Sequence, residues 1–291
     1  MNIVKRSTIF LSLSAFLVIA AWVIVLVLGL HPGIDLKGGT RWTVSFPQHE
    51  VTSESVRSAL LPELGDRSFL VNATESGLLV IRLPNTSEEE HQRYLTILES
   101  FGEVQEEQFS SIGPTIGAEL RKSAIWAIIL VLFGISTYIA WAFRKVSRPI
   151  ASWKYGLVTL VTLFHDVSIP LGLVALLGVE IDTNIIVALL VVMGFSVHDT
   201  IVVFDRIREN VKMHWRSTVS FADIVNRSVR ETIARSINTS LTLIFVLVAL
   251  LIWGPESLFY FLLALLVGTV AGTYSSIFVA SPLLFLWRGR E

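Results

Sequence analysis

Six long apolar blocks are the feature that most restricts what this sequence can fold into. The hydrocarbon core of a bilayer is about 30 Å thick and takes roughly 20 apolar residues of helix to cross. Such blocks are present at residues 9–30, 123–143, 155–177, 183–204, 233–253 and 258–287. Of the 291 residues, 53% are hydrophobic and only 16% are charged, whereas a soluble domain carries about a quarter charged residues. We therefore expect an α-helical polytopic membrane protein with six transmembrane helices.

The first apolar block follows Lys5 and Arg6, as the core of a signal peptide would. It is longer than the apolar part of a signal peptide, and no cleavage site of small residues follows it. We interpret it as an uncleaved anchor, so that residues 1–30 form the N-terminus and the first span, and residues 123–291 contain the other five.

Lysine and arginine collect on one side of the six spans. If the N-terminus is on the inside, the only charged residues of the two short outside loops are acidic: Glu180, Asp182 and Glu256. Because cytoplasmic loops carry the excess of basic residues, we expect both termini to be cytoplasmic. The basic residues that fall inside are Lys5, Arg6, Arg144, Lys145, Arg148, Lys154, Arg206, Arg208, Lys212, Arg216, Arg227, Arg230, Arg288 and Arg290.

Composition excludes several kinds of chemistry. The chain has no cysteine, which rules out disulfides, thiolate catalysis and cysteine-based metal sites. Its net charge is −1 at pH 7, so charge gives no support for binding of nucleic acid. We find no catalytic constellation and no pattern that indicates a metal or a cofactor, and we expect a protein that is not an enzyme.

Residues 31–122, between the first two spans, are long enough to fold independently. Runs rich in β-forming residues predict strands at 40–46, 69–74, 78–83 and 103–110, and helical patterns cover 52–64 and 87–100. This order, βαββαβ, is that of ferredoxin-like α+β domains. We expect an extracytoplasmic domain with a binding or mechanical role.

Three local signals support these elements. Ser53 is a candidate N-cap for the first helix of the domain. Ser87 followed by Glu90 predicts a capping box at the start of the second. Glu75, Ser76 and Gly77 separate two β-rich runs and indicate a hairpin.

Ionisable residues lie inside three of the expected spans, where they are costly and often functional. At ~1.5 Å per residue, Asp166 lies ~16 Å from the outer end of its span, Asp199 ~24 Å and Arg235 ~27 Å. Asp199 and Arg235 are thus at similar depth and pair if their spans face each other. A structural ion pair is the alternative to an ion or proton site. His165 and His198, each beside an aspartate, are weaker candidates because a hydrogen-bonded neighbour explains them equally well.

Small residues and prolines in the spans predict features of helix packing. Gly268 and Gly272 form a small-xxx-small pair, which indicates a close approach of the last span to a neighbouring helix. Pro170 and Pro282 are expected to bend their spans.

Residues 194–210 read GFSVHDTIVVFDRIREN and resemble the signature of the SecF members of the SecD/SecF family of bacterial protein-export subunits. Four further segments resemble the family in the expected order: GIDLKGGT at 33–40, GPTIG at 113–117, HDV at 165–167 and RSINTSL at 235–241. The resemblance implies that six residues belong to the family's motifs: Asp35, Gly38, Gly39, Gly194, Arg206 and Arg208. Phe195 stands where tyrosine is usual, His198 where asparagine is common, and Leu36-Lys37 where the family has Phe-Thr.

The resemblance implies one half of a twelve-span assembly of the resistance-nodulation-division (RND) superfamily. Its implied partners are a SecD-like subunit, the SecYEG channel, the translocating unfolded polypeptide and the lipid bilayer of the bacterial cytoplasmic membrane. The implied mechanism uses the proton gradient, or sodium in some members, to promote protein export. Asp199 and Arg235 match the family's ion-coupling positions. Asp166 is a third ion-coupling candidate because it lies deep in its span, and Asp205 is a secondary candidate.

Three other functions stay open at this point. One is a half-size exporter of small molecules or lipids from the same superfamily. A second is an intramembrane aspartyl protease with Asp166 and Asp199 as the carboxylate dyad, although the expected Gly-x-Gly-Asp context is missing because Ser196, Val197 and His198 precede Asp199. The third is a purely structural scaffold.

Overall fold

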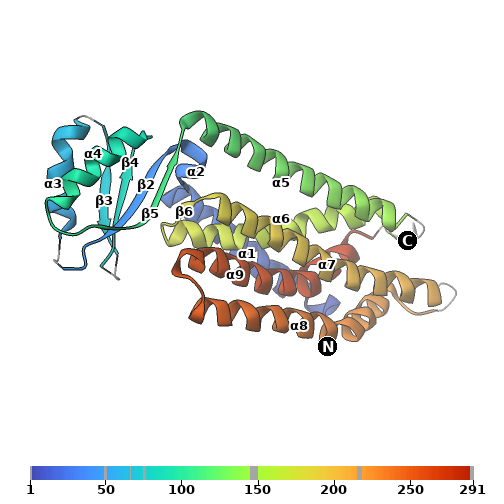
Figure 1. The fold of residues 1–291 in the computed structure, drawn as a ribbon. Helices are drawn as coiled ribbons and strands as arrows, with labels where there is room; N and C mark the ends of the chain where they lie inside the picture. The colour runs from blue at the N-terminus through green and yellow to red at the C-terminus, as the bar shows by residue number, and fades with distance from the viewer. Residues whose placement is uncertain are drawn as a thin grey trace. The chain divides into compact units, whose positions relative to one another are not determined.

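The structure is a computed structural model that describes residues 2–48, 51–65, 67–74, 77–144, 150–214 and 218–288. The chain forms two compact units (Figure 1). One comprises residues 1–31 and 126–291, and the other comprises residues 32–125. Each unit has its own core and is described separately.

Among the described residues, six helical segments are long and apolar enough to cross a membrane, as the sequence predicts. The elements that form them are η1 (Val4–Arg6), α1 (Ser7–Leu28), α5 (Pro114–Ala142), α6 (Ser152–Leu176), α7 (Thr183–Met213), α8 (Phe221–Trp253), η2 (Glu256–Leu258), α9 (Phe259–Ser275), η3 (Ser276–Ala280) and α10 (Ser281–Leu286). Two short strands, β1 (His31–Pro32) and β6 (Glu180–Ile181), flank helices of this set.

Besides α5, which begins at Pro114 rather than at residue 123, two helices run well past the expected spans. α7 continues nine residues beyond residue 204 to Met213, and α8 begins at Phe221 rather than at residue 233. Ser220 caps the start of α8 by accepting a hydrogen bond from the backbone N–H of Asp223 at 3.2 Å. These extensions carry charged residues on one side and buried apolar residues such as Ile207 and Val225 on the other, a pattern that hydropathy alone does not detect.

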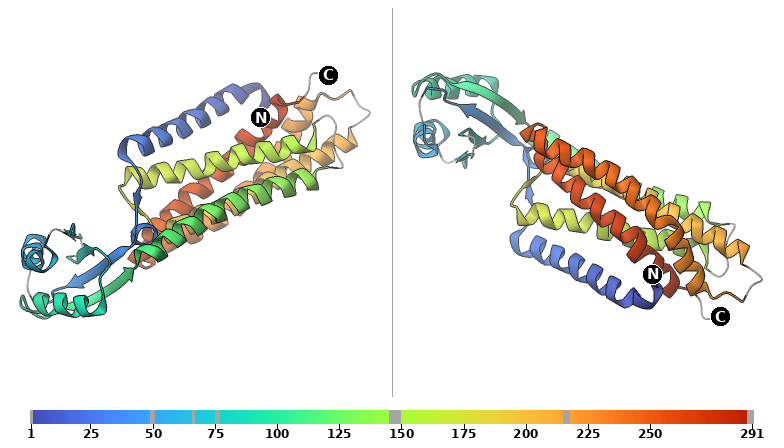
Figure 2. Two further views of the ribbon diagram at one scale, coloured as in Figure 1. Left: turned by 90° about the horizontal axis from the view of Figure 1, so that it is seen from above. Right: turned by 90° about the horizontal axis from the view of Figure 1, so that it is seen from below.

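α6, α7 and α9 form the centre of the bundle, and the helices run side by side in both views of Figure 2. Small residues permit close approach. A Cβ atom on Gly272 of α9 would lie 2.9 Å from Cβ of Ser196 in α7, and one on Gly172 of α6 would lie 2.6 Å from Cβ of Ala21 in α1. The close packing expected at Gly268 and Gly272 is confirmed, with α7 as the neighbour.

The two prolines behave differently. α6 continues as one helix through Pro170. The last span is interrupted just before Pro282, where the π-helical turn η3 separates α9 from α10. Single π-helical turns are frequent near functional sites.

Residues 32–125 form an α+β unit in the order α2 (Ile34–Lys37), β2 (Gly39–Ser45), α3 (Ser53–Leu64), β3 (Leu70–Ala73), β4 (Leu79–Leu83), α4 (Glu88–Glu99) and β5 (Gln105–Ile112). The strands form one antiparallel sheet in the order β3-β4-β2-β5. Thr40 pairs with Leu83 of β4 on one side and with Ser111 of β5 on the other. The first and last strands of the βαββαβ series are therefore neighbours.

The core of this unit contains Trp42, Val56, Leu60, Ile81 and Leu98, contributed by β2, α3, β4 and α4. Side chains along β4 alternate between buried and half-buried positions, which directs one face of the sheet to the core.

Of the three local signals predicted in this unit, one is confirmed in full. The capping box of Ser87 and Glu90 is present in full. The N-cap of α3 is Thr52 rather than Ser53, because Thr52 has the extended backbone and its hydroxyl accepts from the N–H of Ser55 at 3.2 Å. Glu75 and Ser76 of the predicted hairpin lie outside the described residues, while β3 and β4 on either side pair as antiparallel strands.

Candidate functional site

Asp166 joins three helices in the middle of the bundle. Its side chain is fully buried in α6. It accepts hydrogen bonds from the hydroxyl of Ser196 in α7, from the hydroxyl of Ser275 in α9 at 2.8 Å, and from Nδ1 of its neighbour His165 at 2.7 Å. Three donors on one buried carboxylate compensate much of the cost of removing it from water.

His165 presents its second ring nitrogen without a partner. The side chain is 3% exposed, and Nε2 is buried with no hydrogen bond to any described residue. Its ring stacks near Tyr274, with 6.2 Å between centroids, and the Tyr274 hydroxyl donates to the backbone oxygen of Phe10 in α1 at 3.1 Å. His165 therefore contacts Asp166 on one side and Tyr274, which reaches the first helix, on another.

Asp199 is equally buried but far less supported. Its side chain is 2% exposed, and its one hydrogen bond to a described residue is a long contact of 3.4 Å from the hydroxyl of Ser240 in α8. That hydroxyl has a better acceptor in the backbone oxygen of Ser236 at 2.8 Å, and it accepts from Thr273 of α9 at 2.6 Å. Within the described part of the chain no cation forms an ion pair with Asp199.

Arg235 does not meet Asp199. The two lie on adjacent helices, but the Arg235 side chain is exposed on the surface of α8. Asn238 and Thr242 are exposed on the same face at the spacing of helical neighbours. The structure thus shows a polar stripe on α8, which we define as Arg235, Asn238 and Thr242, in place of the pair that equal depth suggested.

The other candidates of α7 separate into two groups. Gly194 and His198 are exposed on its surface. Asp205 forms an ion pair with Arg208 one turn further along. His198 is therefore not part of the buried contacts around Asp199.

Arg206 belongs to a charged cluster that the sequence did not predict. Its Nε lies 2.7 Å from Glu231 of α8, and its Nη1 pairs with Glu209. Glu231 also accepts from Asn210 at 2.8 Å and pairs with Arg227 at 2.9 Å. This cluster ties the extensions of α7 and α8 together.

The glycine motifs of the α+β unit pack against one another. Gly38 has a φ of +81°, and a Cβ there would lie 2.8 Å from Cα of Pro114. A Cβ on Gly117 would lie 2.6 Å from the backbone nitrogen of Gly38. Gly39 has a φ of +131° beside the backbone oxygen of Leu83. Asp35 lies in the short helix α2, which ends directly before Gly38 and Gly39.

Sequence reasoning missed the hydroxyl partners of both aspartates, Ser196, Ser240 and Ser275, and also Thr273, which donates to Ser240. The available signal was the presence of small hydroxyl residues within apolar spans, which often mark contacts between helices. Among the described residues, no three side chains of the metal-binding types gather in one place.

Comparison with known proteins identifies the family. Residues 93–290 match the family model described as protein export membrane protein SecD/SecF, C-terminal. The SecF protein translocase subunit of Thermobaculum terrenum is 43% identical, over 100% of this chain and 95% of the relative. The chain belongs to the SecD/SecF family, among its SecF members. The SecF subunit of Anaerolinea thermophila, 34% identical, also covers 100% of this chain and 95% of its own length.

Solved structures of family members share the fold. The crystal structure of SecDF from Thermus thermophilus, described as a translocon-associated membrane protein, matches with a TM-score of 0.84 and 33% identity. The match covers 100% of this chain but only 39% of that SecDF chain. The SecDF subunit of Bacillus subtilis is 33% identical, over 99% of this chain and 38% of its own length. Membership of the SecD/SecF family and the six apolar helices make this chain a multi-pass membrane protein.

Proposed function

We propose that this chain is an accessory subunit of the Sec protein-export machinery. It acts with a SecD-like partner and the SecYEG channel, and uses the proton or sodium gradient to promote movement and release of unfolded polypeptide across the bacterial cytoplasmic membrane. Full-length similarity to SecF subunits supports the system. The observation that carries the ion-coupling part is Asp199, a carboxylate buried between helices that has one long hydrogen bond and no ion pair among the described residues.

Asp199 and Asp166 have different roles in this proposal. An unpaired carboxylate charge is expensive to bury, so taking up or releasing a cation at Asp199 changes the free energy of the surrounding helices strongly. Asp166 has three donors that compensate its burial and bind α6, α7 and α9 together. Asp199 is therefore the proposed ion carrier, and Asp166 holds the helices that position it.

The polar stripe on α8 supports the need for a partner. The Thr242 hydroxyl donates to the backbone oxygen of Thr239 at 2.7 Å, but a guanidinium and an amide exposed along the same face of an apolar span are costly against lipid. A SecD-like subunit with a carboxylate opposite Arg235 would satisfy them, and arginine suits such a contact because it stays charged. This chain covers 38–39% of the longer SecDF chains that it matches. These matches are consistent with a partner that supplies the rest of such a chain.

The remaining assignments complete the proposal. We place residues 31–122 outside the cytoplasm as a ferredoxin-like domain, since four antiparallel strands in the order β3-β4-β2-β5 with two helices fit that architecture. Both termini are placed in the cytoplasm on the distribution of lysine and arginine. The domain has a binding or mechanical role and the chain is not an enzyme.

The geometry argues against an aspartyl protease. A catalytic dyad requires two carboxylates that share one proton. Asp166 contacts Ser196 and Ser275, whereas Asp199 contacts Ser240. No hydrogen bond joins the two aspartates in the described structure.

Copurification from native membranes tests the proposed system. We expect a SecD-like protein and SecYEG subunits to accompany the tagged chain. Recovery of the chain with neither of them, under conditions that preserve other membrane complexes, would favour the half-size exporter of the same superfamily.

A further inference from the structure

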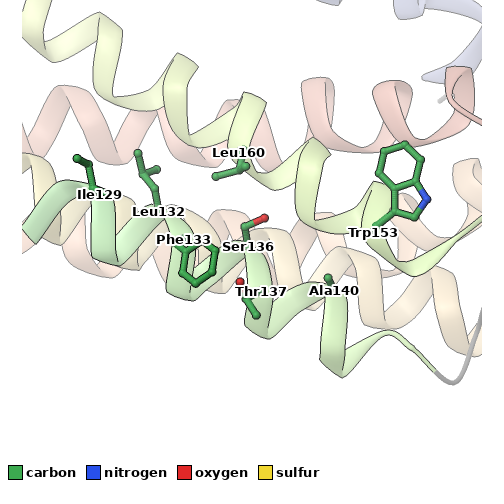
Figure 3. Close-up of a pocket in the computed structure, with 8 residues that line it drawn as sticks. All are labelled: Ile129, Leu132, Phe133, Ser136, Thr137, Ala140, Trp153 and Leu160. Carbon is green, nitrogen blue, oxygen red and sulfur yellow. The ribbon is translucent and has the colours of Figure 1, made fainter. Parts of the chain in front are cut away.

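A groove lies on the surface of the bundle between α5 and α6 (Figure 3). Its volume is about 540 Å³, within the range of roughly 300–1,000 Å³ that is typical of sites for small organic ligands. One face of α5 supplies most of its wall, and α6 supplies the rest. The lining residues are Ile129, Leu132, Phe133, Ser136, Thr137 and Ala140 from α5, and Trp153 and Leu160 from α6.

The groove exists because the two helices meet closely at a point and leave large side chains exposed beside it. A Cβ on Gly156 of α6 would lie 2.8 Å from the backbone oxygen of Ser136. Around this contact, Phe133 is 70% exposed and Trp153 is 59% exposed. The lining is almost wholly apolar, and α5 and α6 are both expected to cross the membrane. An acyl chain fits such a wall better than a water-soluble ligand does.

One end of the groove is basic. Figure 3 places Trp153 at that end, beyond Ala140. Nζ of Lys154 lies 5.9 Å from the Trp153 ring, and the guanidinium of Arg144, in the turn after α5, lies 4.5 Å from the ring of Trp141. No acidic residue occurs between residues 140 and 160 of the sequence. Basic sites between transmembrane helices on the cytoplasmic side are the places where proteins hold anionic lipid head groups.

We propose that this groove binds an anionic phospholipid. One acyl chain lies along Leu132, Phe133 and Leu160, and the phosphate lies at the end marked by Trp153, within reach of Lys154 and Arg144. Lys154 donates one hydrogen bond to the backbone oxygen of Trp287 at 2.6 Å, which leaves two of the three ammonium donors for a phosphate. The inference requires that α5 and α6 cross a membrane with this end on the cytoplasmic side, which is the orientation proposed above, and does not rest on the export function itself.

The bound lipid would brace α5 against the bundle. α5 follows β5 directly in the chain and continues into the membrane unit. Along α5, the apolar side chain that is fully buried is that of Ile139, near the end of the helix. Ile129, Leu130 and Phe133 of the same helix are exposed. A lipid in the groove covers Ile129 and Phe133 and adds contacts where α5 has few.

Native mass spectrometry of the full chain tests the site. The purified protein is mixed with equal amounts of phosphatidylglycerol and phosphatidylcholine, and the retained lipid is counted. We expect one phosphatidylglycerol to be retained in preference to phosphatidylcholine. Lys154→Gln and Arg144→Gln should each reduce that preference about fivefold, the effect of roughly 1 kcal/mol per basic residue near a head group. Ala140→Phe should reduce retention of both lipids because it fills the groove.

Matched variants distinguish this site from general lipid adhesion. Lys212→Gln removes an exposed cation elsewhere, and Leu130→Phe enlarges an exposed side chain of α5 outside the groove; both should behave as wild type. Equal retention of the two lipids by wild type, or an unchanged preference in the doubly substituted Arg144→Gln and Lys154→Gln protein, would overturn the proposal. So would loss of the retained lipid when an equimolar SecD-like partner binds, because the groove would then belong to a partner helix.

Discussion

The hydroxyl of Ser275 in α9 donates a hydrogen bond of 2.8 Å to the carboxylate of Asp166 in α6. These two residues are 109 positions apart in the chain. Their contact, with that of Ser196, fixes the relative rotation of the three central helices at one point. Two residues before Ser275, Thr273 donates to the hydroxyl of Ser240, which in turn contacts Asp199.

Ser275→Ala should destabilise the bundle measurably. Hydrogen bonds to charged groups contribute about 1.5–3 kcal/mol, and the loss leaves a buried oxygen with one donor fewer. Ser281→Ala is the matched control, because the Ser281 hydroxyl is buried with no partner among the described residues. Thermal unfolding in one detergent should show a lower midpoint for Ser275→Ala and little change, or a gain, for Ser281→Ala. Equal effects would show that the contact with Asp166 has no special weight.

Gly38→Ala should destabilise the α+β unit more than Gly77→Ala. Both glycines have positive φ, +81° and +79°, so alanine is strained at either position by roughly 1–2 kcal/mol. Only Gly38 adds a clash, since its Cβ would lie 2.8 Å from Cα of Pro114, whereas nothing lies within 4 Å at Gly77. Limited proteolysis of the full chain measures the difference. Equal resistance of the two variants would contradict the packing account of this motif.

The long apolar blocks made the six helices predictable, and the capping box at Ser87 made the start of α4 predictable. In both cases the deciding interactions are local in sequence. The four strands and two helices predicted in residues 31–122 were within about two residues of those observed, because alternation of apolar residues reports the buried face of a strand directly. The short helix α2 was not predicted.

The contacts of the candidate site were not predictable in the same way. Counting residues along a helix gives depth, and it placed Asp199 and Arg235 level with each other. Whether they meet depends on the rotation of α7 and α8 about their axes, which is set by packing between distant segments. In the structure that rotation buries Asp199 toward Ser240 and leaves Arg235 on the exposed face. The contacts of Ser196 and Ser275 with Asp166 were not predicted for the same reason, because they depend on how α6, α7 and α9 are rotated.

Arg206→Lys combined with Arg208→Lys should reduce export. Arg206 uses two different nitrogens to bind Glu231 and Glu209, and a lysine ammonium does not reproduce that forked geometry. The measurement is secretion of an exported reporter in cells that depend on this chain, with expression level checked by immunoblot. Full export by the double variant would mean that these residues serve only as basic anchors at the inner membrane surface.

Cysteine accessibility tests the proposed topology, and the natural absence of cysteine makes every introduced one unique. Glu89→Cys, on the exposed side of α4, should react with a membrane-impermeant maleimide in cells whose outer surface is accessible. Lys212→Cys, near the end of α7, should react only after the membrane is opened. The reverse pattern would overturn the orientation and with it the placement of the α+β unit outside the cytoplasm.

Gradient-driven export by Asp199→Asn tests the central claim most directly. The chain, its SecD-like partner and SecYEG are reconstituted in vesicles, and export is measured with and without an imposed ion gradient. We predict that Asp199→Asn inserts and folds but loses the stimulation by the gradient, that Asp199→Glu keeps part of it, and that Glu256→Gln, an exposed carboxylate substitution, keeps all of it. Normal stimulation with Asp199→Asn would contradict the account and leave Asp199 a structural residue.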